Sequence, residues 1–123
     1  MLAGSVIEPF LEPGTSRSIG LNPDRIGAAV PGYLPSSLIM RRSMLDRVGL
    51  FDPTLWSAND TDWFVRAGTL GFEALVVPEV LVRYRIHESN QSSNISAGQK
   101  SLLQMIRMNI VRRRKLGNPQ DRA

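Results

Sequence analysis

The spacing of apolar and polar residues predicts a chain in which strands and helices alternate. Short apolar or alternating runs, which are typical of strands, occupy residues 36–42, 73–78 and 80–87. Apolar residues recur at helical spacing over residues 43–49, from about 60 to 71, and over 97–118. We therefore expect an α/β fold with a short mixed sheet, flanking helices and a C-terminal amphipathic helix.

The ends of two predicted helices carry residues that suit these positions. Ser43 can cap the first helix with its side-chain oxygen, and Gly49 can adopt the left-handed conformation that ends it. Ser96 and Gly117 can start and end the last helix in the same way.

Residues 1–34 are rich in glycine and proline, which favour turns and loops. We expect mostly loop there, with one short strand near Ser5–Ile7. By length the chain is a single domain. We divide it into a loop-rich segment (1–34), a core (35–96) and a C-terminal helical segment (97–123).

Composition excludes several classes of protein. Apolar residues make up 42% and charged residues 21% of the 123 residues, which is ordinary for a globular protein. The absence of cysteine excludes disulfides and thiolate metal sites. The N-terminus lacks the basic segment and long apolar run of a signal peptide, and no apolar stretch reaches the ~20 residues that span a bilayer. The sequence therefore predicts a soluble, cytoplasmic protein.

The net charge of +4 comes from the last predicted helix, where Lys100, Arg107 and residues 112–115 are basic and residues 100–115 include no acid. One apolar stripe runs along the same helix and consists of Leu102, Leu103, Ile106, Ile110 and Val111. We expect this stripe to be buried against the domain or against a second copy of the chain. The alternative is a basic amphipathic helix that rests on an anionic membrane surface. Nucleic acid binding is not expected, because no aromatic residues interleave the basic ones.

The segment 58–68, ANDTDWFVRAG, places two carboxylates close together at the start of the second predicted helix. In a structural interpretation, Asn59 caps the helix, while Asp62 completes a capping box or pairs with Arg66. In a chemical interpretation, a carboxylate at the positive end of the helix stays ionised and accepts a proton. Asp60-Thr61-Asp62 also has the DxD form of a metal-diphosphate motif. We do not assign that motif, because it opens a helix instead of following a buried strand.

Five short motifs, in a fixed order over residues 35–92, favour the chemical interpretation. They are VGLFD (48–52), NDTDW (59–63), GF (71–72), VP (77–78), and RIH (85–87) followed by Asn90 and Ser92. Together they closely resemble the C-terminal, acceptor-side half of family 2 glycosyltransferases of the GT-A fold. The resemblance covers about half of the chain. It implies an inverting transfer of a sugar from a nucleotide-sugar donor to a hydroxyl acceptor.

The resemblance implies roles for the two carboxylates. In this family, the aspartate of an acidic motif that opens a helix is the general base that deprotonates the acceptor hydroxyl, and Asp60 matches it. Asp62 is the second candidate for this base, because Asp62 and Trp63 match a common variant of the motif. This chain has Asn59 where the family usually has glutamate.

The resemblance also implies binding residues. Trp56 and Trp63 are candidates for stacking on a sugar, and the alternative for each is a place in the core. Arg83 and Arg85 can meet phosphate, or they can be solvated. His87, the single histidine, is a candidate ligand of Mg²⁺ or Mn²⁺ or of the nucleotide diphosphate, and the alternative is a structural role. A metal ion would need further oxygen ligands from elsewhere.

Members of this family begin with a nucleotide-binding half that carries the true DxD motif, and no such half precedes Met1. We therefore expect this chain alone to be inactive. The alternative is a non-catalytic interaction or oligomerisation module of the same ancestry. In the catalytic interpretation, Asp60 and His87 should lie on the same side of the domain.

Overall fold

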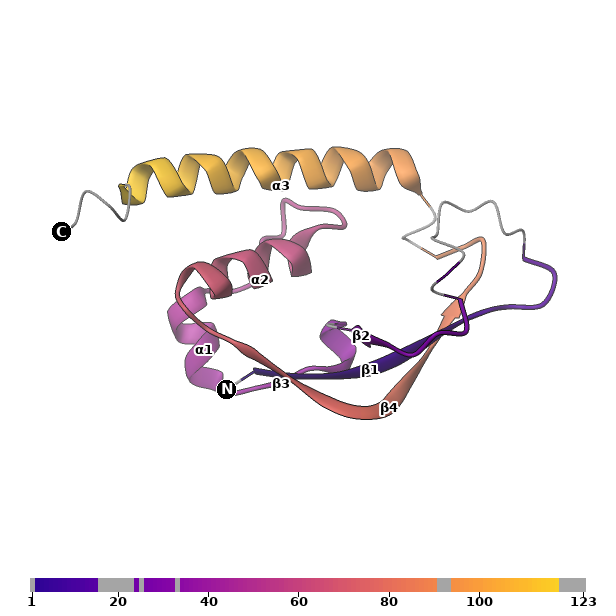
Figure 1. Ribbon diagram of the computed structural model, residues 1–123. Helices are drawn as coiled ribbons and strands as arrows, with labels where there is room; N and C mark the ends of the chain where they lie inside the picture. The colour runs from indigo at the N-terminus through magenta and orange to yellow at the C-terminus, as the bar shows by residue number, and fades with distance from the viewer. Residues whose placement is uncertain (1, 16–23, 25, 33, 91–93, 118–123) are drawn as a thin grey trace.

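The computed structural model describes residues 2–15, 24, 26–32, 34–90 and 94–117. The elements follow the order β1 (Leu2–Leu11), β2 (Val30–Gly32), η2 (Pro35–Ser37), β3 (Ile39–Met40), α1 (Arg42–Val48), α2 (Asn59–Thr69), β4 (Ala74–Ile86) and α3 (Ile95–Leu116). Figure 1 shows them as layers, with the sheet below, α2 above it, and α3 above α2. The fold is mixed α/β, as the sequence predicts.

β1 is the central strand of the sheet. On one side it pairs antiparallel with β2, with Ile7 opposite Val30, and with β3, with Leu2 opposite Met40. On its other side it pairs with β4 in parallel along its whole length. The sheet is therefore mixed, because it combines antiparallel and parallel pairs.

The prediction of a loop-rich segment over residues 1–34 is wrong for Leu2–Leu11, which form β1. The predicted strand near Ser5–Ile7 is only the middle of it. Pro9 is accommodated in β1 although its nitrogen has no hydrogen to donate. β2 pairs only with residues 5–7 of β1, so no strand on that side requires a hydrogen bond from residue 9. Residues 16–23 of the same segment lie outside the described part of the chain.

The predicted strands 73–78 and 80–87 are one continuous strand, β4. Ser5 of β1 pairs with Val77, but the next residue of β1 pairs with Val80, so Pro78 and Glu79 form a bulge. Proline cannot donate a hydrogen bond to a neighbouring strand. The bulge carries the strand past this position.

The predicted strand 36–42 is shorter in the structure, because Pro35–Ser37 form a 3-10 turn and only Ile39–Met40 pair with β1. The helix that follows begins at Arg42, with Arg41 before it as the capping position. Ser43 lies inside this helix and does not cap it, contrary to the prediction. Gly49 ends the helix with φ 87°, as predicted.

The two longer helices begin and end within about two residues of the predicted positions, but their caps differ. α2 is preceded by Ala58, so the capping box of Asn59 and Asp62 is wrong. In α3, the side chain of Asn94, not Ser96, accepts a hydrogen bond from the backbone N–H of Ala97 at 3.2 Å. This pair occupies the positions of an N-cap interaction.

The apolar core contains two clusters. The first lies between the sheet, α1 and α2, and contains Leu2, Met44, Val48, Trp63 and Ala67. The second lies beneath α3 and contains Leu55, Ala58 and Met105, with Met108 against them. α2 contributes Trp63 and Ala67 to the first cluster, and Ala58, which directly precedes α2, belongs to the second.

The apolar stripe of α3 is exposed in the single chain, so the prediction that it is buried against the domain is wrong, while its burial against a second copy of the chain stays a prediction. Leu103, Ile106 and Ile110 are 55%, 43% and 45% exposed. The face that packs on the domain instead carries Ser101 and Met105, which are buried. The expectation failed because apolar character alone does not decide which face of a helix finds a partner. Within the described chain, no helix has both the length and the apolar character needed to cross a membrane.

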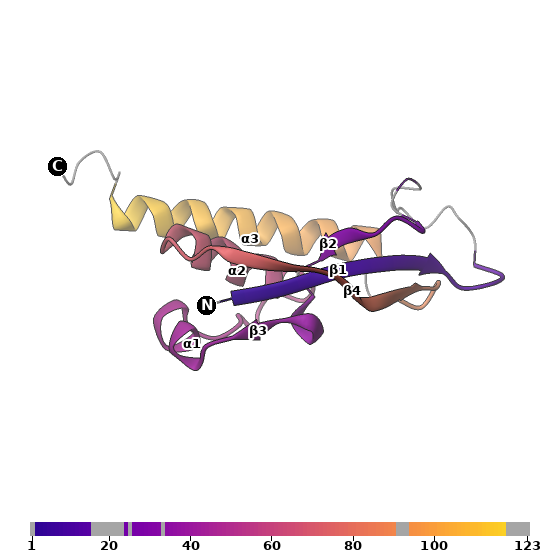
Figure 2. The same ribbon diagram turned by 60° about the horizontal axis from the view of Figure 1, so that its bottom comes forward.

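One face of the sheet packs against α1 and α2 at Leu2, whereas much of β4 is uncovered on both faces. Figure 2, turned so that the bottom comes forward, shows β1 and β4 in front of α2 and α3. Residues 74–81 of β4 are all exposed, including Leu75 and Leu81. Within the described residues, β4 pairs with β1 alone, so its other edge carries no strand.

Substitution of Gly32 by alanine should destabilise the fold. A Cβ built at Gly32 would lie 2.6 Å from Cγ2 of Ile7, so β2 or Ile7 would have to move. We expect the free energy of unfolding to fall by about 1–3 kcal/mol, as in other overpacked cores. Gly98→Ala is the matched control, since its Cβ meets nothing within 4 Å. This control should stabilise α3 by about 0.5–1 kcal/mol. Urea unfolding of both variants measures the difference, and equal stabilities would contradict the packing described for β2.

Candidate functional site

Asp60 lies at the second position of α2 with its side chain only partly buried. Its Oδ1 accepts a hydrogen bond from the backbone N–H of Thr61 at 2.7 Å. Its own N–H donates to Oδ1 of Asn59 at 2.8 Å. These two side chains satisfy donors of the first turn that would otherwise lack a partner, since the residue before α2 is alanine.

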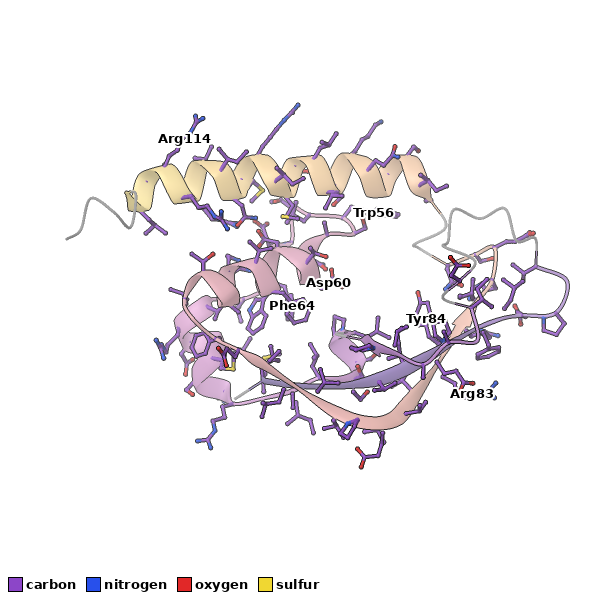
Figure 3. The ribbon with its side chains drawn as sticks, in the orientation of Figure 1. Trp56, Asp60, Phe64, Arg83, Tyr84 and Arg114 are labelled. Atoms are coloured by element: carbon purple, nitrogen blue, oxygen red, sulfur yellow. The ribbon has the colours of Figure 1, made fainter. Side chains whose placement is uncertain are left out.

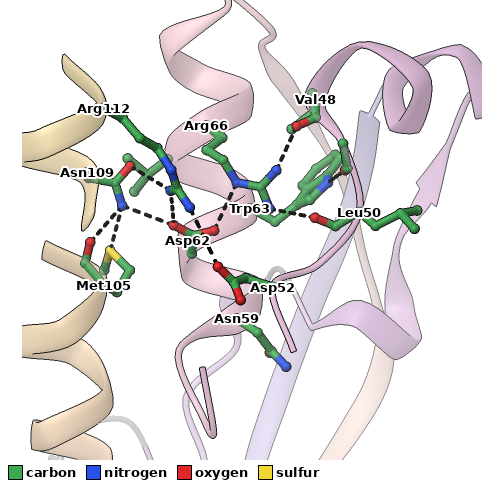
Figure 4. A network of polar contacts seen from close by, with 12 residues as sticks. Val48, Leu50, Asp52, Asn59, Asp62, Trp63, Arg66, Met105, Asn109 and Arg112 are labelled. Atoms are coloured by element: carbon green, nitrogen blue, oxygen red, sulfur yellow. Dashed lines mark hydrogen bonds and ion pairs between the residues drawn. The ribbon is translucent and has the colours of Figure 1, made fainter. Parts of the chain in front are cut away.

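Asp62 is fully buried, with 0% of its surface exposed. Figure 4 shows its carboxylate among three donors. Oδ2 accepts from Nε of Arg66 at 2.9 Å, and Oδ1 accepts from Nδ2 of Asn109 at 3.1 Å and from Nη1 of Arg112 at 2.5 Å. The predicted pairing of Asp62 with Arg66 is therefore confirmed. The burial of Asp62 argues against its use as a base, because an acceptor hydroxyl cannot reach an oxygen that is enclosed and already bonded.

Arg66 connects this carboxylate to the segment that follows α1. Its Nη1 donates to the backbone oxygen of Val48 at 2.6 Å, and its Nη2 donates to that of Leu50 at 2.8 Å. The indole N–H of Trp63 donates to the oxygen between them, on Gly49, at 2.8 Å. The guanidinium of Arg66 and the indole of Trp63 thus donate hydrogen bonds to three consecutive backbone carbonyl groups.

Trp63 is part of the core. Its side chain is 0% exposed, and its ring packs against Phe51 and Phe64 at centroid distances of 5.7 and 5.8 Å. The structure therefore favours the core interpretation of Trp63 over stacking on a sugar. Trp56, in contrast, is exposed in the loop before α2. Figure 3 shows Trp56 and Asp60 at the same end of this helix.

Arg112 reaches a second carboxylate, on Asp52. Its Nη2 lies 3.7 Å from Oδ2 of Asp52. The other oxygen of Asp52 accepts hydrogen bonds from the hydroxyl and the backbone N–H of Thr54, at 2.6 and 2.9 Å. These two hydrogen bonds lower the pKa of Asp52 below its ordinary value, and the positive charges of Arg112 and Arg66 lower it further.

Ser101 joins α3 to the start of α2. Its hydroxyl oxygen accepts from the backbone N–H groups of Ser57 and Ala58 at 3.1 and 3.2 Å. Ser101, Asn109 and Arg112 share one face of the last helix, and their role was not predicted from the sequence. The feature of the sequence that could have identified them is the recurrence of polar residues, at helical spacing, on the face opposite the apolar stripe. Only the packing of the helix shows that this is the inner face.

Arg83 and Arg85 are exposed on β4 and form ion pairs with the neighbouring strand. Arg83 lies 3.5 Å from Glu8 and its guanidinium stacks over the ring of Phe10, while Arg85 lies 3.2 Å from Glu12. Figure 3 shows Arg83 pointing away from α2, and strand alternation places Arg85 on the same face. The structure does not bring these two arginines to the side of the sheet where Asp60 lies.

The RIH motif forms the turn that ends β4. Nδ1 of His87 accepts from the backbone N–H of Ser89 at 3.2 Å, and the N–H of His87 donates to Oδ1 of Asn90 at 3.0 Å. Nδ2 of Asn90 donates in turn to the backbone oxygen of Arg85 at 3.1 Å. The motif therefore has a structural use in this turn. Ser92, its last residue, lies outside the described part of the chain.

The residues that the structure describes do not come together as a divalent metal site. Nδ1 of His87 is engaged by Ser89, so a metal would have to bind at Nε2. Among the described residues, no three side chains of histidine, aspartate or glutamate come together as metal ligands. That Asp60 and His87 lie on the same side of the domain stays a prediction.

Substitution of Asp62 by asparagine should destabilise the fold strongly. The amide has almost the shape of the carboxylate, but it leaves two arginines without their buried counter-charge. We expect a loss of about 3 kcal/mol and a melting temperature lower by roughly 10 °C. Asp46→Asn on the exposed side of α1 is the matched control and should melt like the parent chain. Calorimetry measures both, and equal melting temperatures would show that the buried network does not stabilise the fold.

Substitution of Thr54 by valine should raise the pKa of Asp52 towards its ordinary value, because the hydroxyl donor is lost. Since folding lowers the pKa of Asp52, its charge stabilises the fold above the pKa of the unfolded chain. This contribution disappears as the pH falls through the lower, folded-state pKa. Titration of the carboxyl carbon by NMR measures the pKa in both chains. An unchanged pKa would contradict the assignment of Thr54 as the main cause.

Comparisons of the chain with models of known protein families, with curated proteins and with solved structures found no match. What the chain does must therefore be inferred from its own motifs and from the geometry of the site.

Proposed function

We propose that this chain is the acceptor-side part of an inverting, sugar-nucleotide-dependent glycosyltransferase of the GT-A type, in which Asp60 is the general base. The observation that carries this proposal is the contrast between two neighbouring carboxylates. Asp62 is enclosed between two arginines, whereas Asp60 is partly exposed at the end of the helix. The order of the five sequence motifs adds support that is independent of this geometry.

The surroundings of Asp60 hold one of its carboxylate oxygens in place and leave the other open. The backbone N–H of Thr61, in the first turn of α2, donates to Oδ1. Among the described residues, Oδ2 of Asp60 accepts no hydrogen bond, so this oxygen is the one offered to an acceptor. The acceptor oxygen bonds to the anomeric carbon as the bond to the nucleotide diphosphate breaks. The hydroxyl proton passes to Oδ2.

Trp56 supplies the second part of the acceptor site in this proposal. Its indole is half exposed in the loop that leads into α2, at the same end of the helix as Asp60. An exposed indole offers a flat apolar surface on which the C–H face of a sugar can rest. Asp62 acts as a positioning residue, because its bonds to α3, together with the bonds of its partner Arg66 to Val48 and Leu50, fix the direction in which α2 points.

The donor side of the reaction is assigned to other parts of the intact enzyme. A family 2 enzyme uses Mg²⁺ or Mn²⁺ to neutralise the diphosphate of the leaving group, but the described residues do not form a site for such an ion. Arg83 and Arg85 lie on the far face of β4 and are paired with glutamates. No step of the proposed reaction depends on them.

The alternative function is a non-catalytic interaction module of the same ancestry. The observation that favours it is the exposure of β4, whose residues 74–81 are open on both faces. An exposed strand edge with apolar side chains is a surface on which another strand can pair. In this alternative, Asp60 serves only to satisfy the first turn of α2.

Asp60→Asn separates the two functions. The amide can still accept from the N–H of Thr61, so the melting temperature should stay within about 2 °C of the parent, as for most surface changes. Transfer from UDP- or GDP-sugars to a hydroxyl acceptor, measured with Mn²⁺ in the native protein that contains this sequence, should fall by about 10²–10⁴-fold. Asp46→Asn should leave the rate unchanged. If the native protein with Asp60→Asn keeps full turnover, or if the unsubstituted native protein transfers no sugar, the non-catalytic interaction function is favoured.

A further inference from the structure

The outer face of α3 combines apolar and basic side chains without any acidic one. Leu103, Ile106 and Ile110 follow each other by three and four residues, so they lie along one line of the helix. Lys100, Arg107 and Arg114 lie beside this line at the same helical spacing, and all three are exposed. Residues 94–117 contain no aspartate or glutamate.

The packing of the domain fixes which face of α3 points outwards. Ser101, Met105, Asn109 and Arg112 contact α2 and the loop before it, and together they occupy the opposite face. Figures 1 and 3 show α3 at one boundary of the molecule, with Arg114 pointing away from α2. The apolar line is therefore presented without any rearrangement of the chain.

We propose that the outer face of α3 binds the surface of an anionic phospholipid bilayer. A helix with this pattern lies in the plane of the membrane surface, with its apolar side chains at the level of the acyl chains. The basic residues beside them then face the negatively charged headgroups. The domain, held on the inner face, stays in the water. This surface is independent of Asp60 and of the activity proposed above.

Charge complementarity favours a lipid surface over a second copy of the chain. If two copies paired through this face, Arg107 and Arg114 of both helices would be brought close together with no carboxylate of α3 between them. Like charges at such short range destabilise a helix pair. An anionic bilayer removes the apolar side chains from water and neutralises the basic ones at the same time. A nucleic acid would satisfy only the charges and would leave the three apolar side chains exposed.

Co-sedimentation with vesicles tests the proposal on the full chain. Binding should be strong to vesicles of phosphatidylcholine mixed with phosphatidylglycerol and at least tenfold weaker to phosphatidylcholine alone, because several basic side chains contribute. Added salt should weaken binding to the anionic vesicles. Equal binding to both kinds of vesicle, or binding to neither, would overturn the proposal.

Two substitutions at the apolar line give the sharpest test. Ile106→Glu and Ile110→Glu should each lower the partition coefficient for anionic vesicles by about tenfold or more, because each loses one buried apolar side chain. Leu81→Glu is the matched control on β4, where the parent side chain is 65% exposed, and should bind like the parent. Circular dichroism should show the same helix content in all chains, since every substituted position is exposed. Full binding by both α3 variants would contradict the proposed surface.

The basic residues are tested separately. Arg107→Gln and Arg114→Gln should each weaken binding by about fivefold, which corresponds to about 1 kcal/mol for each basic residue near an anionic surface. Arg42→Gln, exposed on α1, should have no effect. Light scattering without vesicles completes the test, with a monomer as the expected result. A dimer that Ile106→Glu converts to monomer, with no vesicle binding by the parent, would assign the face to a second copy instead.

Discussion

A single buried carboxylate, on Asp62, connects three segments of the chain that are distant in sequence. Through Arg66 it reaches the carbonyl groups of the segment after α1, and through Asn109 and Arg112 it reaches α3. Its own helix, α2, contributes Trp63 and Ala67 to the first apolar cluster. A charge at this depth is tolerated only when its partners are in place, so the positions of these segments are interdependent.

The way in which α3 is held explains both proposed surfaces. Hydrogen bonds and an ion pair, together with Met105 and Met108, fix the inner face of α3, so its apolar residues are left to face outwards. The same contacts fix the start of α2, where the hydroxyl of Ser101 accepts from the backbone just before the helix. The exposed end of α2 with Asp60 and the outer face of α3 are thus two consequences of one packing arrangement.

The sequence predicted the parts of the fold that depend on local pattern. The α/β class, the long helices and the glycines that end α1 and α3 follow from periodicity and from the conformational freedom of glycine. The parts that depend on tertiary partners were missed. β1 forms across Gly4 and Pro9 because β4 pairs with it, and β4 continues through Pro78 because a bulge accommodates it. Neither the length of β1 nor the continuity of β4 can be predicted from the residues of the strand itself.

For the candidate site, the acidic start of α2 was predicted from the sequence. Which of its two carboxylates is buried and which is partly exposed was not. Asp60 and Asp62 are separated by one residue, yet helix geometry turns one towards solvent and the other towards α3. The pairing with Arg66 was predictable because it lies four residues along the same helix. The pairing with Arg112 was not, because it depends on which face of α3 packs inwards.

The double-mutant cycle of Asp62→Asn and Arg112→Gln tests this account most directly. It measures the free energy of unfolding of the parent, both single variants and the double variant. Because the carboxylate and the guanidinium are in direct contact, we predict a coupling free energy of about 1–3 kcal/mol between them. Effects that simply add, with no coupling, would contradict the claim that the buried carboxylate holds α3 to α2.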